Sequence, residues 1–307
     1  PKPVDEYVPL SKAADGTITT QYTMTTLEEL GLLKMDFLGL RTLTVIQNAA
    51  KMAGLKDDTL MDIDFDDQNV YEMIGAGKTE GVFQLESAGM TQFMTELKPE
   101  NMEDIIAGIS LYRPGPMDYI PQYIEGKNNR DSVTYDCPQL EPILEPTYGC
   151  IVYQEQVMQI CRQLAGYSYG RADLVRRAMA KKKHDVMEKE RESFLDGAEQ
   201  NGIDRKIANE IFDEMSSFAS YAFNKSHAAA YAVLSYQTAW LKCHYPKEYM
   251  AALLTSVLDN ANKVAIYNAE CNRLGIRVLP PHVNTSETGF TAVGNDIRFG
   301  LLAVKNL

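Results

Sequence analysis

Helical periodicity between about residues 60 and 275 constrains the fold of this chain more than any other feature of the sequence. Apolar side chains recur there every three or four residues, as they do along the buried face of an amphipathic helix. The clearest helices are predicted over residues 154–165, 171–197, 204–217, 226–244 and 246–258. The pattern therefore predicts a mostly α-helical fold with small β elements.

Strand signals are short and few. The runs 150–153 and 276–279 are rich in β-branched residues, which favour extended backbone. Near the end of the chain, two alternating runs flank Gly294 and Asn295, and this arrangement is typical of a β-hairpin. We therefore expect a short β element near residues 276–301, attached to the helical region.

The charge of the chain limits what it can bind. The 307 residues carry a net charge of −12, and the first 110 residues hold 19 acidic and 8 basic side chains. Attraction of the whole molecule to nucleic acid or to anionic lipid is therefore not expected, so any polyanion site must be a local basic island. No apolar run approaches the roughly 18 residues of a membrane span. Five cysteines without paired spacing fit a reducing cytoplasm.

One basic stretch stands out in this acidic chain. Residues 171–183 contain six basic side chains and one acid, Asp173. On a helix, Arg177 and Lys181 would stand one turn apart, beside a second stripe that carries Arg176 and Lys183. Guanidinium and ammonium groups suit a triphosphate or a phosphodiester backbone. A solvated helix face is the structural alternative, and the strong local charge imbalance favours a binding role.

A second candidate site is the start of the helix predicted from residue 226. Asn224 or Ser226 could cap that helix. Lys225 and His227 beside a helix N-terminus would favour a bound anion, because the first backbone N–H groups have no partners within the helix. A capped helix start with an ordinary histidine is an equally good interpretation of these residues alone.

Two further features are weaker. Residues 32–38 predict a short buried strand around Lys34 and Asp36, and a carboxylate there could bind a hard cation such as Mg²⁺. A single aspartate at a strand end is more often structural. Arg113 lies in a rigid turn before Pro114, where a binding role and a structural role cannot be separated from the local sequence.

Seven strings of residues together point to a family. They cover 36–44, 81–87, 112–117, 148–158, 176–183, 223–227 and 236–242. In this order the chain resembles the α (catalytic) subunits of bacterial replicative DNA polymerase III, which are C-family DNA polymerases. Ala180 and Ala222 depart from the pattern, because many relatives have glycine there. Both changes are small.

The resemblance implies a division into domains. Residues 1–58 look like the C-terminal segment of a mixed α/β palm domain, and residues 59–307 look like a helical fingers domain. In the family, three palm aspartates hold two Mg²⁺ ions. Asp36 matches the third of them, and the first two belong to a motif that this chain does not contain.

The resemblance also assigns roles to the basic residues. Arg176, Arg177 and the lysines Lys181, Lys182 and Lys183 match the fingers helix that faces the incoming deoxynucleoside triphosphate (dNTP). Further residues of the nucleotide pocket, matched less specifically, are Lys34, Asn224, Lys225 and His227.

The implied activity is template-directed nucleotidyl transfer from a dNTP to a primer 3′-hydroxyl by a two-metal mechanism. The implied partners are primer-template DNA and dNTPs and, for the full-length protein, the sliding clamp and other replisome subunits, with no membrane partner. The isolated chain is expected to be inactive, because it has one of the three metal-binding aspartates. A non-catalytic helical module that binds nucleic acid or a replication partner is the alternative. A regulatory nucleotide sensor is a third interpretation, which nothing in the sequence requires.

Overall fold

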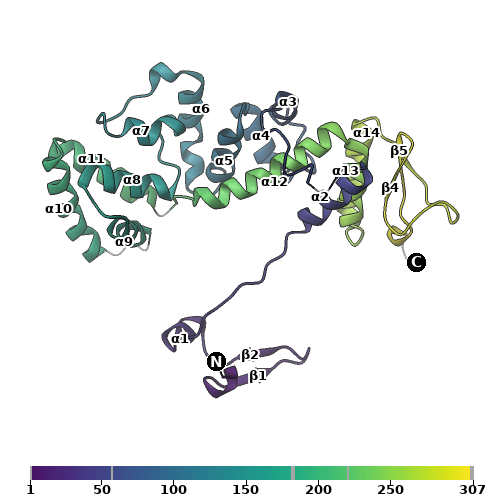
Figure 1. Ribbon diagram of the computed structural model, residues 1–307, viewed down its shortest axis with the longest axis horizontal. Coiled ribbons are helices and arrows are strands. Elements are labelled where there is room, and N and C mark those ends of the chain that lie inside the picture. The colour runs from purple at the N-terminus through teal and green to yellow at the C-terminus, as the bar shows by residue number, and fades with distance from the viewer. Residues whose placement is uncertain (1, 57, 181–183, 220, 305–307) are drawn as a thin grey trace. The chain divides into compact units, whose positions relative to one another are not determined.

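The computed structural model describes residues 2–56, 58–180, 184–219 and 221–304. The chain forms two compact units, Pro1–Leu40 and Arg41–Leu307 (Figure 1). Lys181, Lys182 and Lys183, which the sequence places in the basic stretch, lie outside the described residues. The assignment of residues 1–58 to a palm domain and of residues 59–307 to a fingers domain rests on the family resemblance, and it stays a prediction.

The first unit is small. A two-stranded antiparallel hairpin places Leu10 opposite Thr20, and its turn uses Gly16 at a φ of +88°. Asp15 stabilises this turn by accepting a hydrogen bond from the Thr17 N–H. The elements in chain order are η1 (Val4–Glu6), β1 (Leu10–Lys12), β2 (Ile18–Thr20) and α1 (Met24–Glu29).

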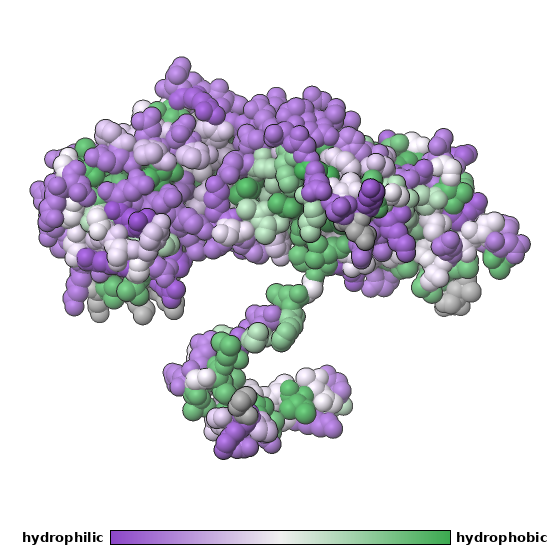
Figure 2. Space-filling model, in the orientation of Figure 1, coloured by the Kyte–Doolittle hydropathy of each residue, from purple (hydrophilic) through white to green (hydrophobic). Residues whose placement is uncertain are grey.

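The prediction of a buried strand over residues 32–38 is wrong for this chain. The described backbone from 32 to 40 is irregular, and Phe37 and Leu38 are 90% and 91% exposed. A strand is held by a neighbouring strand and by burial of one face, and no described residue pairs with this segment. The stretch that joins the two units is mostly apolar in colour (Figure 2).

The second unit is built from helices, which confirms the predicted fold class. Their bounds agree closely with the sequence pattern for α8 and α12, and Pro246 occupies the first turn of α13. The helices are α2 (Arg41–Met52), α3 (Gln68–Gly75), α4 (Ala88–Leu97), α5 (Met102–Leu111), α6 (Ile120–Asn128), α7 (Glu141–Leu144), α8 (Gln154–Ala165), α9 (Tyr169–Ala180), α10 (His184–Gln200), α11 (Arg205–Ala219), α12 (Lys225–His244), α13 (Pro246–Ser256) and α14 (Ala261–Arg273), with 3₁₀ turns η2 (Pro116–Tyr119), η3 (Arg130–Ser132), η4 (Glu145–Thr147) and η5 (Leu301–Ala303).

Two hydrophobic cores meet within this unit. The larger surrounds the long helix α12 and includes α2 to α5, α13 and α14, whereas the smaller lies between α8, α9, α10 and α11 (Figure 1). Residues 150–153 run between them. Cys150 and Val152 face the larger core, and Ile151 faces the smaller one. Because extended backbone alternates its side chains between two sides, this segment packs on both cores at once.

The single helix predicted over 171–197 is two helices, α9 and α10. Arg171 Nη2 lies 3.0 Å from Glu190 Oε2. In one straight helix, residues 19 positions apart would be separated by about 28 Å, so α10 runs back along α9. The reversal lets both helices bury apolar side chains, such as Val175 and Phe194, in the same core.

The predicted β element is confirmed. Strands β4 (Thr291–Val293) and β5 (Asp296–Arg298) form the hairpin, with Gly294 at a φ of +57° in its turn. Strand β3 (Val278–Leu279) pairs parallel to β5. The run 150–153 contributes an isolated bridge from Tyr153 to Phe223 rather than a strand. Among the described residues, no helix is long and apolar enough to cross a membrane.

Candidate functional site

The basic end of α9 contains one exposed and one half-buried arginine, both bound to the same acid. Arg176 donates to Asp173 Oδ1 from Nε and Nη2 at 3.1 and 2.7 Å, and from Nη1 to Gln154 Oε1 at 3.0 Å. Arg177 Nη2 lies 2.7 Å from Asp173 Oδ2. The hydrogen bonds from Arg176 and the charges of both arginines lower the pKa of Asp173. The Arg177 side chain is 64% exposed, against 17% for Arg176.

The start of α12 confirms the predicted cap. Asn224 Oδ1 accepts a hydrogen bond from the His227 N–H at 2.8 Å, which satisfies one of the free donors of the first turn. The Lys225 N–H donates to the Glu155 carboxylate, and Lys225 Nζ lies 2.8 Å from Glu103 Oε2. The Lys225 ammonium group is therefore already paired with Glu103, and its backbone N–H with Glu155, while His227 is exposed.

A chain of hydrogen bonds links these two regions. Gln154 Nε2 donates to the Ala222 carbonyl at 3.1 Å, while its Oε1 accepts from Arg176. The backbone of Phe223 exchanges hydrogen bonds with Val152 and Gln154 across the isolated bridge. The position of Arg176 is thus fixed relative to the chain that leads into α12.

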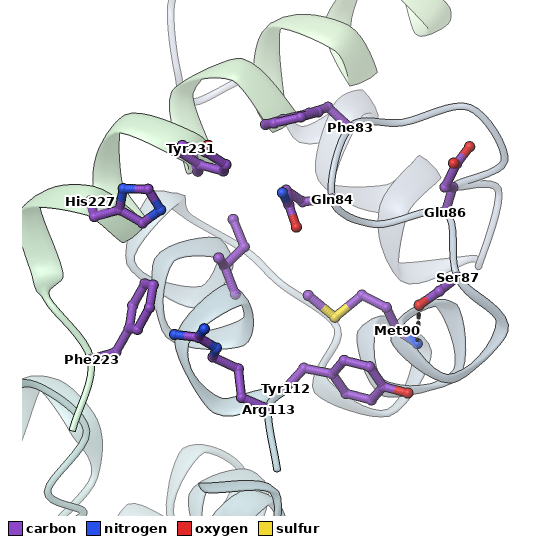
Figure 3. A pocket seen from close by; sticks show the side chains of 11 residues that line it. Phe83, Gln84, Glu86, Ser87, Met90, Tyr112, Arg113, Phe223, His227 and Tyr231 are labelled. Carbon is purple, nitrogen blue, oxygen red and sulfur yellow. Dashed lines mark hydrogen bonds between the residues drawn. The ribbon is translucent and has the colours of Figure 1, made fainter. Parts of the chain in front are cut away.

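A pocket of about 540 Å³ opens beside the first turns of α12. Figure 3 shows side chains from three segments around one space: Phe83 and Gln84 from the loop before α4, Tyr112 and Arg113 from the end of α5, and Phe223, His227 and Tyr231 from α12 and its approach. The structure therefore brings three of the family strings together. Of the predicted site residues, His227 lines this pocket.

The rings around this pocket form a series that we call the aromatic ladder, namely Phe83, Tyr231, His227 and Phe223. Successive ring centroids lie 5.3, 4.2 and 5.5 Å apart. The Arg113 guanidinium carbon lies 4.4 Å from the Phe223 centroid, a cation–π distance. His227 and Tyr231 are four residues apart on α12, so they share one face of the helix. That spacing was the sequence signal for Tyr231, which the sequence reasoning did not use.

The loop that carries Phe83 and Gln84 is fixed by buried polar groups of α12. Lys242 Nζ donates to the carbonyls of Lys78 and Glu80 at 3.0 and 2.8 Å, and its side chain is fully buried. Thr238 Oγ1 accepts from the Phe83 N–H at 3.1 Å. Sequence reasoning assigned no role to these groups, because the residues they hold are more than 150 positions away in the chain.

Lys242 is neutralised by a buried carboxylate. Its Nζ lies 2.6 Å from Glu270 Oε1, and Arg273 contacts the other oxygen of that carboxylate at 2.7 Å. Burial lowers the pKa of Lys242, and the hydrogen bond and charge of Glu270 oppose that shift. A buried charge is tolerated only when it is paired and hydrogen-bonded, and this one has three oxygen acceptors.

Lys34 and Asp36 belong to the first unit. Lys34 Nζ lies 2.8 Å from Asp36 Oδ1, and both side chains are more than half exposed. The hydrogen bond and charge of Asp36 raise the pKa of Lys34. In the described part of the chain, no three histidine, cysteine, aspartate or glutamate side chains gather to hold a metal ion. Asp36 can therefore supply one carboxylate of a metal site but not a complete one.

Comparisons with known proteins define the class first. The family described as the bacterial DNA polymerase III alpha subunit finger domain matches residues 42–202, and the alpha NTPase domain of the same subunit matches residues 1–39. A helix-hairpin-helix motif matches 275–307, although the described residues of that range form β3, β4, β5 and η5. These matches identify part of a bacterial DNA polymerase III alpha subunit.

The chain belongs to the bacterial DNA polymerase III alpha subunit family. It is 51% identical over 314 residues to DNA polymerase III subunit alpha of Thermus aquaticus, covering 100% of this chain and 26% of the relative. It is 45% identical over 309 residues to the protein of the same name from Bacillus subtilis, covering 100% of this chain and 28% of that relative. The chain thus spans about a quarter of the length of these relatives, and the predicted family is confirmed.

Proposed function

We propose that this chain forms part of a template-directed DNA polymerase and contributes a triphosphate-binding surface at the end of α9. The observation that carries the proposal is the exposed guanidinium of Arg177, beside a hydrogen-bonded connection to the pocket at the start of α12. The family membership supplies the reaction class, in which a primer 3′-hydroxyl attacks the α-phosphorus of a dNTP and pyrophosphate leaves.

The two arginines have different roles in this proposal. Arg177 is held by one exposed ion pair, which is worth about 0–1 kcal/mol, whereas a charge-assisted hydrogen bond to phosphate is worth about 1.5–3 kcal/mol. A triphosphate can therefore displace Asp173 from Arg177. Arg176 has three hydrogen bonds and little exposure, so it positions α9 against Gln154. Lys181, Lys182 and Lys183, which lie outside the described residues, are assigned to triphosphate binding by the family resemblance.

Further residues of the nucleotide site follow from the resemblance. His227 lines the pocket, and Asn224 holds the first turn of α12 in place. Lys225 would contribute charge at the edge of the site, offset by Glu103. Lys34 is assigned to dNTP binding by the resemblance alone.

The proposed metal ligand is Asp36. Its carboxylate is exposed and contacts only Lys34 among the described residues, and oxygen ligands of this kind suit Mg²⁺. When bound, Mg²⁺ would neutralise charge that develops on the phosphate oxygens. Because one carboxylate does not complete such a site, the isolated chain is not expected to extend primers.

The remaining parts of the proposal concern domains and partners. We assign residues 1–58 to the palm and 59–307 to the fingers. Primer-template DNA is the expected polymer partner, and the helix-hairpin-helix match at 275–307 also points to DNA binding. Contacts with the sliding clamp and other replisome subunits are expected of a full-length subunit that contains this chain.

The test uses Arg177→Ala in a full-length subunit that carries this chain. Loss of one charge-assisted contact should lower kcat/KM for dNTPs about ten- to a hundredfold, with primer-template affinity changed little. Arg205→Ala is the control, because Arg205 is another surface arginine, 40% exposed, and it pairs with three acids of α10. Unchanged dNTP kinetics with weaker, less salt-dependent DNA binding would indicate that α9 binds the DNA backbone rather than the triphosphate.

A further inference from the structure

We propose that Gln154 is a positioning residue for the triphosphate-binding surface, because it fixes Arg176 and thereby sets where Arg177 presents its guanidinium. The proposal rests on the polymerase function proposed above and adds a residue that acts through other side chains rather than on the nucleotide. Gln154 is the first residue of α8, where the group of helices α8 to α11 meets the start of α12 (Figure 1).

Both ends of the Gln154 side-chain amide are used. Its Oε1 accepts from Arg176 Nη1 at 3.0 Å, and its Nε2 donates to the Ala222 carbonyl at 3.1 Å. The Gln154 backbone N–H also donates to the Phe223 carbonyl at 2.9 Å. A carboxylate would have no donor for the Ala222 carbonyl, and an ammonium group would have no acceptor for the guanidinium. The two partners together therefore suit an amide.

Arg176 in turn holds the carboxylate that Arg177 shares. It donates two hydrogen bonds to Asp173 Oδ1, at 3.1 and 2.7 Å, and the other oxygen, Oδ2, lies 2.7 Å from Arg177 Nη2. When a phosphate group takes Arg177, Asp173 keeps its pairing with Arg176, so no carboxylate is left without a cation. Release of Arg177 therefore costs only an exposed ion pair, which is a weak interaction.

The exposed fractions of the two arginines agree with this division of roles. The Arg176 side chain is 17% exposed, whereas that of Arg177 is 64% exposed. A half-buried guanidinium that loses an acceptor has to turn toward another one, because leaving its N–H groups unpaired costs free energy. Without the Gln154 acceptor, we expect Arg176 to move, and the shared carboxylate to move with it.

Apolar packing by itself does not fix the direction of the Arg177 side chain. Val175 and Met179 are buried in the smaller core and hold α9 as a whole against its neighbours. Such contacts are non-directional, and they leave a long side chain on the exposed face free to change rotamer. The hydrogen bonds through Gln154 supply direction. A ligand that binds a side chain already in place loses less conformational entropy, so Gln154 contributes to dNTP affinity.

The test uses Gln154→Met in a full-length subunit that carries this chain. Methionine keeps the length of the side chain but removes both hydrogen bonds. We expect kcat/KM for dNTPs to fall about five- to tenfold, mainly through a higher KM, with primer-template affinity changed less than about twofold. Gln237→Met is the matched control, because Gln237 is a buried glutamine of α12 that donates to the Leu60 carbonyl at 2.9 Å. It should lose stability but keep its dNTP kinetics.

A double variant shows whether Gln154 acts through Arg177. Because Arg177→Ala removes the group that is positioned, adding Gln154→Met should lower kcat/KM by less than about a further twofold. A glutamine with a merely structural role would lower it equally in both backgrounds. Thermal unfolding checks that each variant is folded at the assay temperature. If Gln154→Met does not fold, Gln154→Asn gives the same comparison, since its amide is one methylene too short to reach both partners.

The outcomes separate this proposal from the previous one. A loss of kcat/KM in Gln154→Met that disappears in the Arg177→Ala background supports it. The proposal is overturned if the folded variant keeps the dNTP kinetics of Gln237→Met, or if its effect is undiminished beside Arg177→Ala. In both of those cases the triphosphate surface still stands, provided that Arg177→Ala alone lowers kcat/KM. Unchanged kinetics in Arg177→Ala would overturn the triphosphate surface itself, and the role of Gln154 with it.

Discussion

The pocket beside α12 and the segment 32–40 both carry residues that the family resemblance marks as functional, yet the described chain holds only the pocket in place. In the loop that carries Phe83 and Gln84, the Phe83 N–H donates to Thr238 and the Lys78 carbonyl accepts from Lys242, and both hydrogen bonds span more than 150 residues. Asp36 has one exposed ion pair. The difference shows that a motif typical of a family can mark either a complete site, as at the pocket, or one residue of a site, as at Asp36.

The largest effect is expected in the segment 32–40, where Asp36 has one exposed ion pair. Asp36→Asn in a full-length subunit should reduce nucleotide incorporation by at least about a thousandfold, because metal charge stabilisation is worth several kcal/mol. Folding should be unaffected, since the carboxylate contacts only Lys34 among the residues that the structure describes. Primer-extension kinetics with circular dichroism measures both. Near-normal turnover in a folded variant would make Asp36 structural.

The second effect concerns the groups that hold the pocket. Lys242→Met should lower the free energy of unfolding by about 3–5 kcal/mol, because Glu270 and two carbonyl groups would lose a buried partner. Urea denaturation measures the change. Lys263→Met is the matched control, since its partly exposed pair with Glu86 should cost no more than about 1 kcal/mol. Equal losses of unfolding free energy in the two variants would show that the buried ion pair of Lys242 stabilises the fold no more than the partly exposed pair of Lys263.

Removing the charge of Glu270 as well gives a stricter test of this prediction. Adding Glu270→Gln to Lys242→Met should recover part of the lost stability, because the unpaired buried charge disappears. A double variant less stable than Lys242→Met would instead show that Glu270 acts mainly through Arg273.

A smaller effect should appear as pH dependence at α9. The pKa of Asp173 is lowered from 3.8 in the folded protein, so its ion pairs stabilise the protein above about pH 3.8. That contribution is lost as the pH falls through the folded value. Asp173→Asn should therefore cost about 1 kcal/mol at pH 7. The difference from the unmodified chain should narrow over the acid range in which both remain folded, as measured by urea denaturation.

The smallest effect is expected for a substitution in the segment 32–40. Phe37→Ala should change the free energy of unfolding by less than about 0.5 kcal/mol, because the ring is 90% exposed and loses almost no buried area. Thermal unfolding of the 307-residue chain provides the measurement. A loss of 3 kcal/mol or more, typical of a buried phenylalanine, would mean that the ring is covered in solution.

Much of the fold could be predicted because it depends on local patterning. Apolar spacing located α8, α11, α12 and α13, and the Gly294 turn located the hairpin of β4 and β5. The errors arose where local pattern and tertiary context disagree. Residues 171–197 have helical character throughout, but packing against α8 folds them into two helices. The apolar run 32–38 has strand character but no described neighbour to pair with.

The sequence by itself determined the family, the basic stretch at Arg176 and Arg177, and a helix cap at Asn224 or Ser226, because each depends on residue types at short spacing. Only the tertiary structure decided that Arg177 is exposed while Arg176 is held by Gln154. It also decided that Phe83, Gln84 and Arg113 meet His227 around one pocket. The physical reason is that side chains far apart in the chain come together only through packing of the cores and through buried hydrogen bonds such as those of Lys242. The spacing of residues along a sequence does not encode those contacts.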